Sequence, residues 1–396
     1  WRGQPVGVVQ PTEAEPELLH RARVLDAVLG REITTRLNEG YASQVSRTNR
    51  AYDAFADAIY NSLLTQTRLK KYLDSIDLVI TENSIELDLS GITTMFQDKI
   101  ATDPVNGITD LIEFNKVAGD LLYGTQWDGY AMLEETLRTR TVTPELQEVF
   151  TTFDVRFNGA QGTADDDITL GDETDRTVSG ANGDDVLLGG AGNESIAGGN
   201  GNDVISGGAG NDTLRGEWGD DTYIFRRGSG NDIIEDSRGS NTVLFSGLTP
   251  DDISVTADSY DNFTFRINDT GETLTVRTAG GYWEGSQWVR QASVDSFIFS
   301  DGSAWDRDEV LRQSVVKPTE GNDVIDGSRV DDVILGLGGN DVISGNGGND
   351  TLDGGTGDDT LRDNAGDDTY TFGRGYGKDI IDRKSTRLNS SHGYIS

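Results

Sequence analysis

Apolar residues recur at intervals of three and four along the first 157 residues, which is the spacing of amphipathic helices that face a core. Two early segments, residues 16–33 and 50–76, show this pattern most strongly. Three later segments repeat it: residues 106–122, 127–139 and 143–153. Thr143 is the expected N-cap of the last helix. Residues 78–90 alternate instead, which predicts a hairpin of two short strands around Glu82 and Asn83.

From Gly162 the spacing changes to one acidic residue in every nine, followed two positions later by one large apolar residue. The acids of the first block are Asp185, Glu194, Asp203, Asp212 and Asp221. Those of the second block are Asp323, Asp332, Asp341, Asp350, Asp359 and Asp368. The apolar residues are Leu187, Ile196, Ile205, Leu214, Tyr223, Ile325, Ile334, Ile343, Leu352, Leu361 and Tyr370. Two weaker units precede the first block, with Asp167 in the acidic column and Arg176 in place of an acid.

Between the two blocks the pattern is that of β-strands joined by turns such as residues 268–271. The segments that begin at Gly219 and Gly366 are alike and lie 147 residues apart, so the chain contains one full long repeat and the start of another. The last stretch breaks the pattern and resembles a tail found on unrelated translated sequence assemblies, so we exclude it from the fold. We expect a multidomain α plus β chain with these parts: a helical region (1–157), a first glycine-rich block (158–224), a strand-rich β module (225–313), a second block (314–371), the start of a second module (372–382) and the tail (383–396).

The net charge of the chain indicates which classes of binding partner it favours and which it repels. The 396 residues include 68 acidic and 33 basic ones, a formal net charge of −35, and most of the excess lies after residue 155. Such a surface repels nucleic acid and anionic lipid and favours hard cations. No apolar run is long enough for a membrane-spanning helix, and the absence of cysteine excludes disulfides and thiolate metal sites. The start at Trp1, without an initiator Met, suggests a piece of a longer protein.

The repeated unit reads GGxGxDxUx, where U is a large apolar residue, as in residues 198–206. Three residues around U predict a short strand with U pointing inward, and GGxGxD predicts a turn whose positive φ angles suit glycine. Two units complete a coil, so residues 18 apart stack at roughly the 4.8 Å strand spacing. The stacked acids then form seven pairs: 185 with 203, 194 with 212, 203 with 221, 323 with 341, 332 with 350, 341 with 359 and 350 with 368.

Paired carboxylates next to turn carbonyls offer the oxygen ligands that Ca²⁺ prefers, whereas Mg²⁺ keeps its waters and Zn²⁺ lacks Cys and His here. We expect about seven calcium ions. Glu194, which is longer by one methylene, and the turn at residues 327–332, where Val330 replaces glycine, are expected to bind more weakly. One inward aliphatic per nine residues buries too little apolar area to offset chain entropy, so calcium binding is expected to supply folding free energy.

These blocks resemble the repeats-in-toxin (RTX) or haemolysin-type calcium-binding family, whose nonapeptide forms a parallel β-roll. The linking segment resembles the haemolysin-type calcium-binding related module. The resemblance implies secretion by a type I exporter, folding outside the cell where calcium is high, and an extracellular or cell-surface partner. It also implies side-chain ligands at the eleven acids and carbonyl ligands at turn glycines: Gly199, Gly201, Gly208, Gly210, Gly339, Gly348 and Gly357.

We expect no enzyme in this chain. Its two histidines, His20 and His392, cannot form an HExxH zinc site, and no serine lies in a GxSxG elbow. The favoured interpretation is a structural, adhesin-like segment of a large secreted protein. The alternative is the non-catalytic repeat region of a secreted toxin or hydrolase whose active domain lies elsewhere.

Overall fold

The computed structural model describes residues 69–80, 85–119, 122–158, 161–172, 177–236, 238–258, 260, 262–277, 279–284, 287–291 and 294–383. The chain divides into two compact units, one of residues 1–155 with 300–302 and one of the remaining residues. The helices expected within residues 16–33 and over most of 50–76, His20, His392, and nearly all of the tail lie outside the described residues.

The first unit is helical around a small hairpin. Its elements are α3 (Lys70–Leu73), β1 (Asp77–Ile80), β2 (Ile85–Asp88), α4 (Ser90–Thr102), α5 (Pro104–Ala118), α6 (Gly129–Thr139) and α7 (Pro144–Thr152). The predicted hairpin is confirmed by the antiparallel pairing of β1 with β2, and the three later helices by α5, α6 and α7. The Thr143 side chain accepts the Leu146 N–H as the expected N-cap. Among the described helices, none has the length and apolar character needed to cross a membrane.

Helix α4 was not predicted, although its apolar residues carry a helical signal. Ile92, Phe96 and Ile100 recur every four residues and are buried. Phe96 stacks on Tyr72 at 3.9 Å between ring centroids and meets Phe114 edge to face at 5.4 Å. The predicted hairpin ended at residue 90, and no element was assigned to residues 91–102; packing of these rings stabilises the helix.

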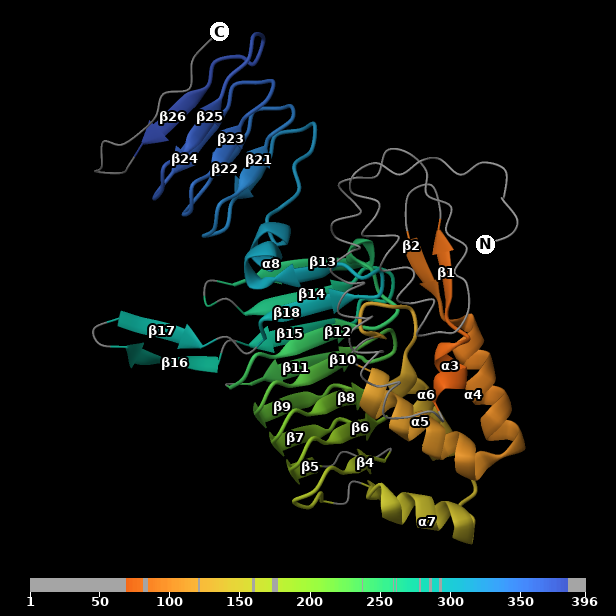
Figure 1. Ribbon diagram of the computed structural model, residues 1–396. Coiled ribbons are helices and arrows are strands. Elements are labelled where there is room, and N and C mark those ends of the chain that lie inside the picture. The colour runs from red at the N-terminus through yellow and green to blue at the C-terminus, as the bar shows by residue number, and fades with distance from the viewer. Residues whose placement is uncertain are drawn as a thin grey trace, which may run out of the picture. The chain divides into compact units, whose positions relative to one another are not determined.

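The second unit begins with a roll of short parallel strands, visible in Figure 1 as a ladder of successive rungs. Strands from alternate nonapeptides form two sheets, and each strand pairs with the one 18 residues later, as in Val186 with Val204. The strands are β3 (Val155–Arg156), β4 (Ile168–Leu170), β5 (Thr177–Asn182), β6 (Val186–Gly190), β7 (Ser195–Asn200), β8 (Val204–Gly208) and β9 (Thr213–Trp218). The inward side chains of Leu187, Ile196, Ile205 and Leu214 are at most 1% exposed, as predicted.

Both sheets run through residue 224, where we expected a separate module to begin. β10 (Thr222–Phe225) pairs in parallel with β8 and with β12 (Thr242–Phe245), and β11 (Asn231–Glu235) pairs in parallel with β9 and β15 (Thr273–Arg277). The remaining elements are η2 (Pro250–Asp252), β13 (Ile253–Ala257), β14 (Phe263–Ile267), β16 (Ala279–Glu284), β17 (Gln287–Gln291), β18 (Ser296–Phe299), β19 (Ala304–Asp306) and α8 (Arg307–Gln313). The sheet orders are β19-β18-β12-β10-β8-β6-β4-β3 and β13-β14-β15-β11-β9-β7-β5.

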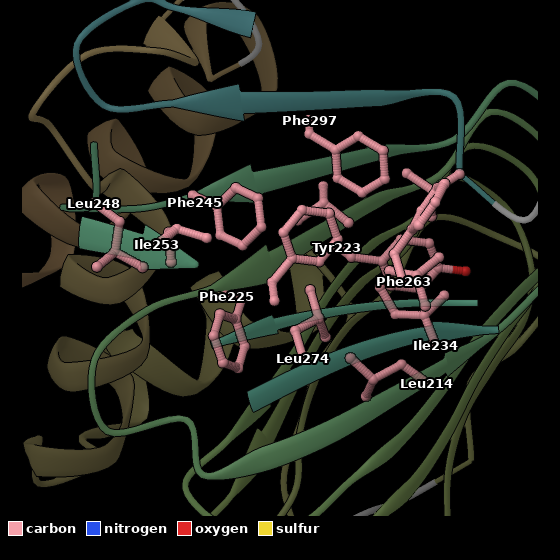
Figure 2. Packing of buried hydrophobic residues seen from close by; sticks show 14 of the residues in the cluster. Leu214, Tyr223, Phe225, Ile234, Phe245, Leu248, Ile253, Phe263, Leu274 and Phe297 are labelled. Carbon is pink, nitrogen blue, oxygen red and sulfur yellow. The ribbon is translucent and has the colours of Figure 1, made fainter. Parts of the chain in front are cut away.

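The interior becomes aromatic where the roll meets the module. Figure 2 shows Phe225, Phe245 and Phe297 in the same buried cluster as aliphatic residues of the roll such as Leu214. Phe245 stacks on Phe299 at 4.9 Å between ring centroids. Aromatic rings bury far more area per residue than the single aliphatic of a nonapeptide, so this end of the roll has a substantial hydrophobic core.

The second block forms another parallel roll with a thinner interior. Its strands are β20 (Val324–Asp326), β21 (Val333–Leu335), β22 (Val342–Ser344), β23 (Thr351–Asp353), β24 (Thr360–Asp363), β25 (Thr369–Thr371) and β26 (Ile380–Arg383). They form sheets in the orders β20-β22-β24-β26 and β21-β23-β25. Five buried aliphatics make up its core: Ile325, Ile334, Ile343, Leu352 and Leu361.

Candidate metal centres

The acidic residues of successive coils are joined by a repeated hydrogen bond. The backbone N–H of one acid donates to Oδ1 of the acid 18 residues later, as from Asp185 to Asp203 at 2.9 Å. The same bond joins all seven predicted pairs: 185 with 203, 194 with 212, 203 with 221, 323 with 341, 332 with 350, 341 with 359 and 350 with 368. The structure therefore brings together the acids that the spacing paired.

The second carboxylate oxygen is the feature that points to a cation. Among the described residues, a buried Oδ2 makes no hydrogen bond in Asp185, Asp203, Asp221, Asp341, Asp350 and Asp359. Each of these six residues is 1% exposed. A buried polar oxygen without a hydrogen-bond partner costs free energy. Their repetition at one position of the turn indicates that the missing partner is not a protein group.

Turn glycines leave room beside these oxygens. A Cβ on Gly198 would lie 2.0 Å from Oδ2 of Asp203 and 2.8 Å from the carbonyl oxygen of Gly216. A Cβ on Gly354 would lie 2.3 Å from Oδ2 of Asp359. The first glycine of the unit thus opens a cradle in which a carboxylate oxygen and a backbone carbonyl of the next coil face the same space. This oxygen-only set suits Ca²⁺.

The glycines expected to offer carbonyl ligands form the bends of the turns. All seven have positive φ: Gly199, Gly201, Gly208, Gly210, Gly339, Gly348 and Gly357. A Cβ on Gly201 would lie 2.0 Å from the carbonyl oxygen of Gly183 in the preceding coil. Only glycine allows both this backbone conformation and this close approach.

Burial changes the protonation of the turn carboxylates. Burial, together with the charge of neighbouring carboxylates, raises the pKa of Asp203 to about 8 and the pKa of Asp185 and Asp221 to about 7. In the second roll burial raises the pKa of Asp350 to about 6. Each of these groups resists carrying a negative charge unless a cation neutralises it.

The first turns of each roll differ from the rest, because their carboxylates already have protein partners. Thr163, Thr319 and Ser328 occupy the second position of their turns, where the repeat has glycine. Their backbone N–H and hydroxyl groups donate to Oδ2 of Asp167, Asp323 and Asp332. Arg156 also pairs with Oδ1 of Asp167 at 2.7 Å. The turn at 327–332, expected to be weak because of Val330, closes in this way.

Glu194 and Asp368 are the other acids at which the repeat is irregular. Glu194 is 3% exposed, and its backbone N–H donates to Oδ1 of Asp212 at 2.7 Å, so its extra methylene does not displace the turn. Asp368 is half-buried and accepts the Asp350 N–H at a longer 3.3 Å. Within the described segments, no three acidic or histidine side chains converge on one point.

Sequence reasoning missed three residues that continue the acidic columns. Asp232 accepts the Asp212 N–H, Asn241 accepts the Asp221 N–H, and Asp379 accepts the Asp359 N–H, each 20 residues away in place of 18. The signal for the two aspartates was present, because residues 228–232 and 375–379 both keep the G-x-G-x-D order of the turn.

Comparison with known proteins agrees with this geometry. The model of the RTX calcium-binding nonapeptide repeat matches four times, at residues 170–204, 188–223, 319–352 and 344–378. The chain is 36% identical over 96 residues to "Iron-regulated protein FrpA" of Neisseria meningitidis serogroup C, a match that covers 24% of this chain and 9% of that protein. The chain thus spans less than a tenth of the length of this relative.

Among solved structures, the extracellular lipase LipA from Serratia marcescens is 20% identical, over 50% of this chain and 30% of the lipase. The TM-score of 0.15 is too low to support an argument about fold or activity. The four repeat matches and the stacked carboxylates rest on the same residues. RTX nonapeptide repeats bind Ca²⁺, and both repeat blocks of this chain match the model of that repeat.

Proposed function

We propose that the two rolls are calcium-dependent folding segments of a larger secreted protein, with a structural, adhesin-like role. The observation that carries the proposal is the column of buried aspartate oxygens that have no hydrogen-bond partner among the described residues. A divalent cation between two coils neutralises these carboxylates and joins the coils. Without it, like charges at the strand spacing favour the open chain.

The proposed side-chain ligands are the acids of the two columns, and the proposed carbonyl ligands are the glycines at the bends of the turns. The seven pairs that the structure places together support about seven ions. In the pairs that begin at Asp323 and Asp332, the oxygen without a hydrogen-bond partner belongs to Asp341 and Asp350. Carboxylate and backbone carbonyl oxygens favour Ca²⁺, which accepts variable coordination, over Mg²⁺, which demands a compact octahedral shell.

RTX repeat proteins are generally secreted, and the charge of this chain fits that route. The net charge of −35 and the thin core of the second roll keep part of the chain unfolded while calcium is scarce, which suits export through a type I secretion machinery. Extracellular calcium then supplies the folding free energy. The folded rolls serve as rigid spacers that present the rest of the protein to an extracellular or cell-surface partner. The proposal assigns no catalytic role to the repeats and no nucleic-acid partner.

The test is a Ca²⁺ titration of the full chain followed by far-ultraviolet circular dichroism, with Mg²⁺ as the control cation. The β signal should rise with a midpoint of about 10⁻⁴ to 10⁻³ M Ca²⁺, the range of extracellular modules, and Mg²⁺ should not reproduce it. A β signal that is complete in chelator would contradict the proposal. A midpoint below micromolar would contradict the secretory part of it, because the chain would then fold before export.

A further inference from the structure

The coil that follows the first block is two residues longer than the others, but its turn is the same. The extra residues fall between Asp221 and Gly228, before the G-x-G-x-D sequence. The Gly210 N–H donates to the Ser229 carbonyl at 3.1 Å, just as the Gly201 N–H donates to the Trp218 carbonyl at 2.8 Å in a regular coil. The insertion therefore leaves the part of the coil that holds carboxylate and carbonyl oxygens unchanged.

Asp232 has the same environment as the acids of the repeat. Its side chain is 1% exposed, and its Oδ1 accepts the Asp212 N–H at 3.0 Å. Its Oδ2 is buried and, among the described residues, has no hydrogen-bond partner. Asp232 lies outside the residues that match the nonapeptide model.

The other column of the same roll ends differently, which shows how the protein closes a column without an ion. Asn241 takes the place of the acid, and its Oδ1 accepts the Asp221 N–H at 2.8 Å. Its Nδ2 donates to Oδ2 of Asp236 at 3.0 Å and to the Arg238 carbonyl at 2.9 Å. A neutral amide is thus satisfied by protein groups, whereas Asp232 ends its column with an ionisable oxygen that has none.

The second roll repeats the backbone hydrogen bond that Asp232 accepts, at a residue that is half-buried. Asp379 lies 147 residues later, at the same point of the long repeat, and accepts the Asp359 N–H at 3.1 Å. The turn bond is also retained, because the Gly357 N–H donates to the Tyr376 carbonyl at 2.7 Å. Two independent copies of an 11-residue unit thus keep an aspartate at the position of the acid.

We propose a further calcium site at the end of each roll, formed by Asp232 with Asp212 in the first roll and by Asp379 with Asp359 in the second. Turn carbonyls of the longer coil complete the oxygen ligands. These sites rest on the proposed function of the repeats and add one ion to each roll. They fix the last coil of each roll to the segment that follows.

The number of bound ions tests this inference. Native mass spectrometry of the full chain in calcium acetate should show that Asp232→Asn and Asp379→Asn each bind one Ca²⁺ fewer than the parent, and that the double variant binds two fewer. Asparagine keeps the Oδ1 acceptor, as Asn241 does naturally, so the coil can still form. Asp251→Asn removes the same charge from an exposed position outside the turns and should bind as many ions as the parent.

Two further measurements separate a lost ion site from a loss of folding. Circular dichroism at saturating calcium should show that the variants are folded, and crystals grown with Tb³⁺ should give an anomalous peak beside Oδ2 of Asp232. Unchanged ion counts in both variants, from a parent that binds calcium, would overturn this inference alone. A parent that binds no calcium would overturn the proposed function as well.

Discussion

The two rolls are built from the same nonapeptide but differ in what surrounds their coils. The first roll shares one continuous core with the β module, including Phe225, Phe245 and Phe297. The second roll has five buried aliphatics. The pKa values of the turn carboxylates differ in the same direction. Burial raises the pKa of Asp203 in the first roll to about 8 and that of Asp350 in the second roll to about 6. We therefore expect calcium to be one of two stabilising elements in the first roll and the main one in the second.

The outward faces differ as well, at positions that the 147-residue repeat makes equivalent. Val186 and Leu188 of β6 are 7% and 0% exposed, whereas Val333 and Leu335 of β21 are 75% and 47% exposed. Identical residues at identical points of the repeat thus have opposite environments. The nonapeptide specifies the coil and its turn, and the surroundings of each roll determine how much apolar area it buries.

The largest effect is expected from filling the cradle of a turn, which both rolls share. Gly198→Ala places a Cβ 2.0 Å from Oδ2 of Asp203, and Gly354→Ala places one 2.3 Å from Oδ2 of Asp359. Each variant should lose calcium affinity at least tenfold, about 1.4 kcal/mol or more, in isothermal titration calorimetry. Gly321→Ala is the control, because its Cβ would meet only Thr319 Oγ1 at 3.6 Å. Normal binding by the first two variants would show that the cradle does not hold the ion.

Truncating one inward aliphatic residue in each roll compares how much stability each core provides. Ile205 and Ile343 are both fully buried, and an isoleucine-to-alanine change costs about 2–5 kcal/mol. With saturating calcium, Ile205→Ala should stay folded on the larger core, whereas Ile343→Ala should unfold the second roll. Urea unfolding and hydrogen exchange of the two variants would measure this. Equal tolerance of both changes would contradict the role given to the aromatic core.

The pH dependence should change sign with calcium. In chelator the folded first roll takes up protons between pH 8 and pH 5, because burial raises the pKa of Asp203 to about 8 and that of Asp185 and Asp221 to about 7, against about 4 in the unfolded chain. Acidification should therefore stabilise the ion-free roll, by about 2 kcal/mol or more.

With calcium bound, protons compete with the ion, so the same acidification should destabilise the roll. Urea midpoints at pH 8 and pH 5, with and without calcium, would measure both signs. Asp203→Asn should reduce the gain in chelator, because it removes the group with the highest pKa of the three. A loss of stability on acidification in chelator would contradict the burial of these carboxylates.

The smallest effect is expected at the first turns, which need no ion to satisfy their carboxylates. Thr163→Val and Thr319→Val remove one hydroxyl donor to Asp167 and Asp323 but keep the backbone donor. Each should lower the free energy of unfolding by about 1 kcal/mol without changing calcium affinity. Thr369→Val, at an exposed strand position, is the control. An altered number of bound ions would show that these turns hold calcium in the same way as the others.

The spacing of the sequence was enough to predict the regular coils. A nine-residue period places Ile205 inward and Asp203 next to Asp185, because both follow from a two-unit coil. The hydrogen bonds that Thr319 donates to Asp323 could not be predicted, since a single hydroxyl-bearing residue in a turn does not recur with the repeat. Asp232 was also missed, because a two-residue insertion interrupts the nine-residue period although the G-x-G-x-D turn is retained. Helix α4 was missed although Ile92, Phe96 and Ile100 recur at a helical spacing.

The central claim is that calcium at the turn carboxylates holds the coils together, most of all in the second roll. Hydrogen exchange measured by mass spectrometry during a Ca²⁺ titration of the full chain tests it directly, because it reports each roll separately. We expect the amides of residues 320–371 to exchange freely in chelator and to become protected only as calcium binds, after those around Phe245. Full protection of both rolls in chelator would contradict the account.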